Sequence, residues 1–384
     1  MRLGQPHGGK LVDRRLAGPK RDRLLEEASE LQKVLMDDNT TMDFWQIATG
    51  GFSPLEGFMG TADYERVLKE ARLANGLVWP LPIVLAVSKG EFSAVREGDD
   101  VALVQASSGS IIGTMHVEEK FKVDLAREAR CIYGYDDPSH PGVIKVLRRS
   151  NLLLAGPIWA LRKPYLPFAD LCRTPEELRA EFRARGWNTI AGFQTRNPPH
   201  RAHEHLQRIA LELLDGLLIH PVLGEKKPGD FKNEAIMEAY KWLIENVYPP
   251  NRVVLSGLAT WMRFAGPREA VFHALVRKNY GCTHFIVGRL HASPSGWYKD
   301  YDAHDYVRQF GREELGIEVL LLKGPFYCQA CGGTATENTC GHDESQRIRI
   351  SMTAIREMLR SGQDPPPELI RPEVARIIAK YGFV

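Results

Sequence analysis

The sequence predicts an α/β protein with a mostly β region first, a doubly wound parallel sheet in the middle, and a small C-terminal part that carries a cysteine cluster. Short apolar runs broken by turns fill residues 76–160. From about residue 175 onward, apolar runs alternate with helical stretches of about 10 to 15 residues, which indicates βαβ units. In such a sheet, ligands bind at the carboxyl ends of the strands.

The N-terminal part begins with helical patterns and continues as strands. A helix is predicted over 21–35 (RDRLLEEASELQKVL), followed by a loop over 50–60 and by the strand-rich region. Near residue 160 the short strand-like runs give way to helical stretches that alternate with apolar runs. We therefore expect an N-terminal domain over 1–160, a catalytic domain over 161–325 and a C-terminal domain over 326–384.

The elements of the last two domains follow from the hydrophobic periodicity. Strands are predicted within 188–193, 216–224, 252–259, 283–288 and 317–324. Helices are predicted within 176–186, 203–214, 234–246, 268–281, 305–316, 350–362 and 371–382.

Composition excludes several classes of function. The 50 Lys and Arg residues nearly balance the 48 Asp and Glu residues, so the net charge of +2 gives no field for nucleic acid or a membrane surface. No stretch has the apolar length of a spanning helix, and we expect a cytoplasmic protein. The chain contains no G-x-x-x-x-G-K-[ST] loop, which excludes Walker-type kinases and ATPases.

Polar residues gather where the strand over 188–193 ends and a helix begins. The segment carries Gln194, Thr195, Arg196, Asn197, His200, Arg201 and His203. A helix N-terminus offers unpaired N–H groups and partial positive charge, so it binds phosphate. The spacing of His200 and His203 places both rings on one side of the first turn, where both donate to one anion.

The segment QTRNPPHRAHE (194–204) resembles the QTRNP-x-HRAHE motif of the ATP sulfurylases, a family of His-x-x-His nucleotidyltransferases. A second segment, GRLHA (288–292), resembles the family's G-R-D-H-A-G motif, with Leu290 in place of Asp and Ser293 in place of Gly. Resemblance extends to 6–14, 50–60, 220–230, 262–270 and 350–359, and so covers nearly the whole chain.

The resemblance implies a fold and a reaction. It implies a PUA-like β domain, a Rossmann-like nucleotidyltransferase domain and a small C-terminal domain that closes over the site. The reaction implied is ATP + sulfate = adenylyl sulfate (APS) + diphosphate. Sulfate has no proton to remove at neutral pH, so catalysis depends on positioning and charge during in-line attack on the α-phosphate. Mg²⁺ is expected to arrive with the nucleotide, and we expect a homodimer.

The resemblance also assigns residues. Thr195, Arg196 and Asn197 form the catalytic loop, and His200 and His203 stabilise charge on the transition state and leaving group. The expected ATP-binding residues are Gln194, Asn197, Gly288, Arg289 and His291, and the expected sulfate ligands are Gln194, Arg196 and the backbone of Ala292. Two further stretches that resemble the family contain Lys226, Lys227, Arg263 and Arg268, which as a group are expected to add positive charge around a polyanion, and no role is assigned to any one of them. Ser351 and Thr353 are expected to cap the helix that follows them and to make a secondary contact to phosphate.

The C-terminal cysteine cluster has the spacing of a metal site. Cys328, Cys331, Cys340 and His342 form a C-x2-C-x8-C-x-H pattern, in which the first pair lets two thiolates reach one ion. Three sulfurs and one nitrogen leave no open position, so the sequence predicts a structural Zn²⁺.

Two other functions remain open at this stage. Another His-x-x-His adenylyltransferase would explain His200 and His203 but leaves QTRNP and GRLHA unexplained. A non-catalytic homologue that binds nucleotide or RNA through its PUA-like domain is favoured only by Leu290 and Ser293.

Overall fold

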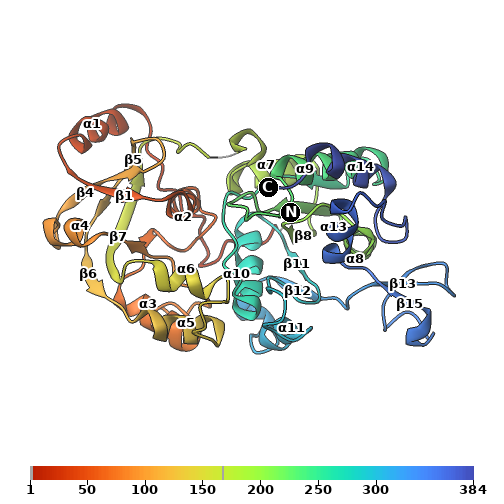
Figure 1. The fold of residues 1–384 in the computed structure, drawn as a ribbon. Helices are drawn as coiled ribbons and strands as arrows, with labels where there is room; N and C mark the ends of the chain where they lie inside the picture. The colour runs from red at the N-terminus through yellow and green to blue at the C-terminus, as the bar shows by residue number, and fades with distance from the viewer. Residues whose placement is uncertain (1–2, 167) are drawn as a thin grey trace.

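The computed structural model describes residues 3–166 and 168–384 and has the predicted α/β architecture (Figure 1). Its N-terminal part is built on a sheet of order β1-β4-β5-β7-β2, and β3 and β6 also pair with β7. The elements of this part are α1 (Gly18–Ala28), β1 (Gln32–Met36), α2 (Asp38–Thr49), β2 (Gly57–Phe58), α3 (Thr61–Glu70), β3 (Leu85–Ala86), α4 (Lys89–Ala94), β4 (Asp100–Gln105), β5 (Ser110–His116), β6 (Glu119–Lys122), α5 (Leu125–Tyr133), α6 (Val143–Arg148) and β7 (Leu152–Ala160).

The helix predicted over 21–35 is wrong in its second half. Helix α1 ends at Ala28, and the chain then forms strand β1, which pairs in parallel with β4. Val34 and Met36 are buried in this strand while Leu35 between them is exposed, which is the period of two that a strand requires. Pairing with the sheet therefore overrides the helical propensity of the residues before it.

The middle part is a five-stranded sheet of order β10-β9-β8-β11-β12, and all four strand pairs are parallel. Its elements are α7 (Pro175–Ala184), β8 (Ile190–Thr195), α8 (Arg201–Leu213), β9 (Gly216–Pro221), α9 (Asn233–Asn246), β10 (Val253–Leu255), α10 (Gly266–Asn279), β11 (His284–Val287), α11 (Asp302–Val307), α12 (Arg312–Leu315) and β12 (Glu318–Leu321). The helix predicted over 305–316 is two short helices, α11 and α12.

The strand order reverses between β8 and β11. From β8 the chain adds β9 and β10 on one side and then returns to add β11 and β12 on the other. The crevice at the carboxyl ends of β8 and β11 is therefore a topological switch point, where doubly wound sheets bind their ligands.

Two cores cover the two faces of this sheet. On one face, α7 and α10 join a core that continues into the N-terminal part, so that Phe272 of α10 lies 5.2 Å from the ring of Phe52 and 5.6 Å from that of Trp79. On the other face, α8 and α9 share a core with the two C-terminal helices. Twelve of the fourteen residues of α10 are buried, because the helix lies between the sheet and the N-terminal part.

The C-terminal part has two components. Strands β13 (Phe326–Cys328), β14 (Gly333–Ala335) and β15 (Arg347–Arg349) form a small antiparallel sheet that projects from the rest of the molecule in Figure 1. Helices α13 (Met352–Arg360) and α14 (Pro372–Tyr381) instead pack against α8 and α9. Within residues 3–166 and 168–384, no helix is both long and apolar enough to cross a membrane.

Candidate active site

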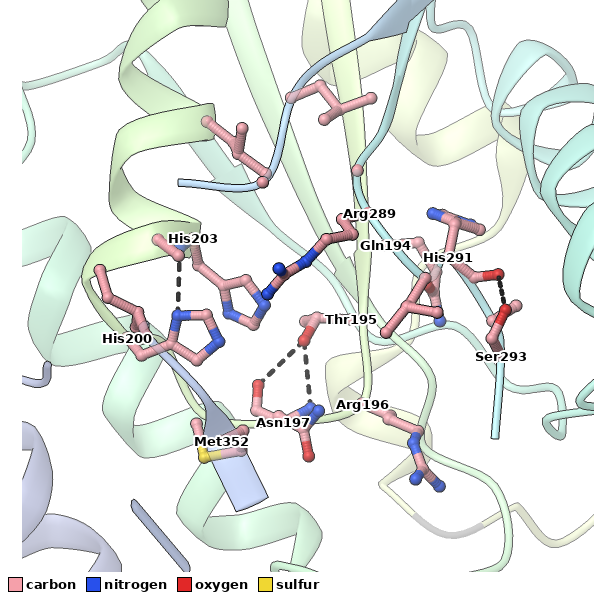
Figure 2. A pocket seen from close by; sticks show the side chains of 18 of the residues that line it. Gln194, Thr195, Arg196, Asn197, His200, His203, Arg289, His291, Ser293 and Met352 are labelled. Carbon is pink, nitrogen blue, oxygen red and sulfur yellow. Dashed lines mark hydrogen bonds between the residues drawn. The ribbon is translucent and has the colours of Figure 1, made fainter. Parts of the chain in front are cut away.

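A cavity of about 340 Å³ lies at the switch point between β8 and β11 (Figure 2). All ten active-site residues proposed from the two motifs line it, namely Gln194, Thr195, Arg196, Asn197, His200, His203, Gly288, Arg289, His291 and Ala292. They come from segments about ninety residues apart, which the parallel pairing of β8 with β11 brings together. Sequence reasoning missed Met262, Phe264 and Arg349, which also line the cavity.

The loop after β8 is held by its own hydrogen bonds. The hydroxyl of Thr195, only 4% exposed, accepts from the backbone N–H of Asn197 at 3.1 Å and donates to the Asn197 carbonyl at 3.0 Å (Figure 2). The side chain of Gln194 donates to the sulfur of Met262 at 3.3 Å. These contacts hold the backbone of the loop at Asn197 and the side chains of Gln194 and Thr195.

His200 and His203 stack at the start of α8. Their ring centroids lie 3.8 Å apart with an interplanar angle of 23°, and Nδ1 of His200 accepts from the backbone N–H of His203 at 3.3 Å. Nδ1 of His203 lies 3.3 Å from the hydroxyl of Tyr240. Burial lowers the pKa of His200 to about 4 and that of His203 well below its ordinary value, so both rings are neutral at pH 7.

The helix N-terminus is less open than the sequence suggests. The backbone N–H of Arg201 donates to the carbonyl of Leu369 at 2.9 Å, and that of His203 is taken by His200. Ala202 is the residue of this turn whose N–H makes no hydrogen bond to the described chain. The anion site that remains there consists of one free N–H, the helix dipole and the two imidazoles.

Arg196 is oriented by charge and by an aromatic ring. Its guanidinium lies 3.7 Å from the carboxylate of Asp230 and 5.0 Å from the ring of Phe264. Behind the loop, Nζ of Lys226 donates to the Arg196 carbonyl at 3.5 Å, and burial followed by the charge of Arg196 lowers the pKa of Lys226 to about 8. Lys226 therefore supports the loop from outside the lining of the cavity.

Two predicted contributors of charge have structural roles. Arg263 is buried and donates to both carboxylate oxygens of Asp43 at 2.7 and 2.9 Å. Arg268 donates to the carbonyls of Val67, Leu68 and Pro80 in the N-terminal part. Both cations bind α10 and the loop before it to the N-terminal part, so the expectation that they add charge around a polyanion is wrong.

The loop after β11 contributes Arg289, His291 and Ala292 to the lining, and in Figure 2 the guanidinium of Arg289 points towards His203 while His291 lies on the other side of the view. Leu290 and Ala292 have φ angles of 54° and 53°, a left-handed conformation that residues other than glycine rarely adopt. Ser351 stands at the N-cap of α13, as predicted, but its side chain makes no capping bond. Ser351 lines the cavity instead, while Thr353 is exposed.

The Cys/His cluster forms a compact set of ligand atoms. The sulfurs of Cys331 and Cys340 lie 3.6 Å apart, and Nδ1 of His342 lies 3.5, 3.3 and 3.5 Å from the sulfurs of Cys328, Cys331 and Cys340. A tetrahedral zinc ion with its usual bond lengths separates such atoms by about 3.5 to 3.8 Å. The donor set and its spacing therefore fit a closed four-ligand metal site.

Comparison with known proteins agrees with this geometry. The sequence model of the ATP-sulfurylase family matches residues 169–381, and that of a PUA-like domain matches residues 4–163. A sulfate adenylyltransferase of Symbiobacterium thermophilum is 49% identical over 97% of this chain and 95% of its own length, and one of Hyperthermus butylicus is 48% identical over 99% and 96%.

Among solved structures, one titled "Hexameric APS kinase from Thiobacillus denitrificans" superposes with a TM-score of 0.77 at 25% identity, covering 98% of this chain and 68% of that one. The predicted fold class, with its PUA-like and nucleotidyltransferase parts, is confirmed. By its sequence and its architecture, the chain belongs to the ATP-sulfurylase family.

Proposed function

We propose that the cavity at the carboxyl ends of β8 and β11 catalyses the reaction of this family, in which ATP and sulfate give APS and diphosphate. The observation that carries the proposal is the convergence of the two motif loops on one cavity. Among its lining residues, all within the described chain, are three arginines and three histidines and no carboxylate. Such a lining suits two anions that must be held in contact.

Each group has a role in this proposal. Gln194, Arg196 and the Ala292 backbone hold sulfate, while Asn197, His200 and His203 bind the phosphates. Gly288, Arg289 and His291 complete the ATP site, and Thr195 to Asn197 form the catalytic loop. One sulfate oxygen attacks the α-phosphorus in line as the bond to diphosphate breaks.

The two neutral histidines act as hydrogen-bond donors. Because Nδ1 of His200 accepts from a backbone N–H, the single proton of its neutral ring lies on Nε2. Donors aimed at the charge that develops on the α-phosphate and the leaving group lower the barrier without moving a proton. Burial of both rings strengthens these bonds.

Two metals are part of the proposal. Mg²⁺ neutralises phosphate charge and enters with the nucleotide, since the described lining offers it no carboxylate. Zn²⁺ is held by Cys328, Cys331, Cys340 and His342 as a structural ion. We further propose domain boundaries after residues 160 and 325, a homodimer and a cytoplasmic location.

A turnover assay tests the function. The purified chain should form APS from ATP, Mg²⁺ and sulfate, and should exchange labelled diphosphate into ATP only when sulfate is present. Exchange that depends on a nucleotide monophosphate or on phosphopantetheine instead would indicate another adenylyltransferase. Nucleotide binding without turnover would indicate a non-catalytic homologue.

A further inference from the structure

A group of aromatic rings joins the loop after β11 to the N-terminal part. The ring of Trp297 lies 5.1 Å from that of Tyr135 and 4.8 Å from that of His140, which is fully buried. The ring of Tyr298 lies 6.0 Å from each of these two rings. Tyr135 and His140 belong to the segment between α5 and α6, so the contact crosses from the PUA-like part to the loop that lines the cavity.

Two hydroxyl groups reinforce this contact with hydrogen bonds to backbone carbonyls. The hydroxyl of Tyr298 donates to the carbonyl of Tyr133, the last residue of α5, at 3.1 Å. The last carbonyls of a helix have no partner within it, so Tyr298 satisfies one of them. In the opposite direction, the hydroxyl of Tyr135 donates to the carbonyl of Trp297 at 2.8 Å. The N-terminal part therefore holds both the rings and the backbone of this segment of the loop.

Tyr298 also packs on Gly266, the first residue of α10. A β-carbon added to Gly266 would lie 2.8 Å from Cδ2 and from Cε2 of Tyr298, so the ring takes the space that a side chain would need. Gly266 has a φ of 47°, a left-handed conformation that glycine adopts readily. In this conformation its backbone N–H donates to the carbonyl of Ala292 at 3.3 Å.

The contact with Gly266 matters because the backbone at Ala292 is strained. Leu290 and Ala292 have left-handed φ angles of 54° and 53°, and strain of this kind persists where the surroundings fix one geometry. Ala292 lines the cavity, and its N–H makes no hydrogen bond to the described chain. The contacts that begin at the carbonyl of Tyr133 thus end at a backbone N–H that is free to bind a ligand.

We propose that Tyr298 is a positioning residue for the sulfate site, and that the PUA-like part holds it in place. The inference rests on the proposed function, in which the backbone of Ala292 holds sulfate. Tyr298 itself lies outside the cavity lining. It acts through Gly266, whose N–H holds the carbonyl of Ala292. A small displacement of a group that positions a substrate is enough to weaken its contribution.

The nucleotide should depend on this contact less than sulfate does. Gly288 and Arg289, which are proposed to bind ATP, follow β11 directly, and Val287 at the end of that strand pairs with Leu321 of β12. The sheet therefore sets the start of the loop, and a loosened Ala292 should raise the KM for sulfate more than the KM for ATP. A general loss of folded protein would instead lower the apparent kcat and leave both KM values unchanged.

Two substitutions of Tyr298 test its role. Tyr298→Leu removes the ring from Gly266 and should raise the KM for sulfate about 10-fold, with less than about a 3-fold change in the KM for ATP. Tyr298→Phe keeps the ring and loses only the hydrogen bond to Tyr133, so it should retain most of the parent's affinity for sulfate. Calorimetry of sulfate binding to the complex with Mg²⁺ and α,β-methylene-ATP, which cannot release diphosphate, measures this affinity without turnover.

Hydrogen–deuterium exchange gives a readout that needs neither substrate. Peptides within 288–298 should exchange faster in Tyr298→Leu than in the parent protein or in Tyr298→Phe, because the backbone of the loop loses its support. The matched control is Tyr306→Leu. Tyr306 is a half-buried tyrosine of α11 whose ring lies 5.4 Å from that of Phe310, outside the cavity lining. This variant should lose stability but keep both KM values and the exchange of 288–298.

An unchanged KM for sulfate in Tyr298→Leu, or an equal rise in Tyr306→Leu, would overturn the proposal. If the parent protein neither bound sulfate nor formed APS, the proposed function would fail. Faster exchange of 288–298 confined to Tyr298→Leu would then still support the anchoring of the loop by Tyr298, and unchanged exchange would overturn it.

Discussion

The carboxylate of Asp230 lies 3.7 Å from the guanidinium of Arg196, and its other oxygen lies 3.9 Å from that of Arg356 on α13. Asp230 thus links the loop after β8 to the C-terminal helices through two cations. In the proposed mechanism the planar guanidinium of Arg196 donates hydrogen bonds to the bound sulfate while it also lies beside the carboxylate of Asp230.

Arg196→Lys should raise the KM for sulfate about 10-fold or more and change the KM for ATP much less. The substitution keeps the charge but loses the paired N–H groups that match a tetrahedral oxyanion. Initial rates at varied sulfate and varied ATP measure the two constants. Arg201→Lys is the matched control, because Arg201 donates to the Pro367 carbonyl and does not line the cavity. An unchanged sulfate KM would remove Arg196 from the sulfate site.

His203→Ala should lower kcat about 100-fold or more while weakening ATP binding only slightly. Its donor is aimed at charge that grows in the transition state, so the ground state loses less than the transition state. Single-turnover rates and nucleotide affinities separate the two effects. His205→Ala, on the same helix but outside the cavity lining, should retain most of the turnover. Equal rates for the two variants would contradict the assignment.

Ala292→Gly should raise the free energy of unfolding by about 0.5–1 kcal/mol, because glycine adopts the left-handed φ of 53° without a clash. The control variant, Ala354→Gly, should instead lower the free energy of unfolding. Ala354→Gly lies within α13, where glycine costs about 1 kcal/mol. Urea unfolding of both variants measures the difference. A loss of stability in Ala292→Gly as large as in Ala354→Gly would show that the loop carries no strain.

Elemental analysis should find about one zinc per chain, since the four ligands close a tetrahedral shell. Cys331→Ser should remove the metal and lower the melting temperature of the C-terminal sheet, because metal binding stabilises folding there. Cys131→Ser, a half-buried cysteine of α5, should leave zinc content unchanged. Added Mg²⁺ should not restore the lost stability. A metal-free, equally stable protein would exclude the zinc site.

Acid should destabilise the protein through its buried histidines. Burial lowers the pKa values of His7 and His140 to about 4, whereas an unfolded chain titrates near about 6.5. Between these values the unfolded chain binds protons that the folded one does not, so the free energy of unfolding falls as the pH drops from about 6.5 towards 4.

His140→Asn tests this, because Oδ1 of Asn keeps an acceptor for the N–H of Gly142 but does not titrate. The variant should lose less stability between pH 7.5 and pH 5 than the parent, as measured by urea midpoints. An identical loss in both proteins would mean that His140 does not contribute to the acid sensitivity.

The sequence predicted the placement of the site because parallel strands end at a common edge. Gln194 to His203 follow β8 and Gly288 to Ala292 follow β11, so neighbouring strands bring the two motifs together. The five strands of the sheet and both C-terminal helices were also predicted. Periodicity is sufficient for these elements because each buries a regular apolar face.

Other contacts had no signal in the sequence. Glu269 and His273 are spaced as an ordinary i,i+4 pair on a helix surface, and only the burial of nearly all of α10 brings Nδ1 of His273 to 3.1 Å from Nε2 of His291. Asp230 lies in the loop between β9 and α9, and its contact with Arg196 in the loop after β8 depends on tertiary packing. The strand that follows Ala28 was missed because its partner β4 lies about seventy residues later, beyond any local pattern.

The position of α10 makes the two halves of the molecule inseparable. Since its apolar side chains are covered by the N-terminal part and by the sheet together, residues 161–384 expressed alone would expose the rings that meet Phe52 and Trp79. We expect such a fragment to aggregate, and in the whole chain we expect the N-terminal part and the five-stranded sheet to melt in one transition. A chimera that takes its PUA-like part from a relative would then also need the residues of α10 that pack against that part in the relative.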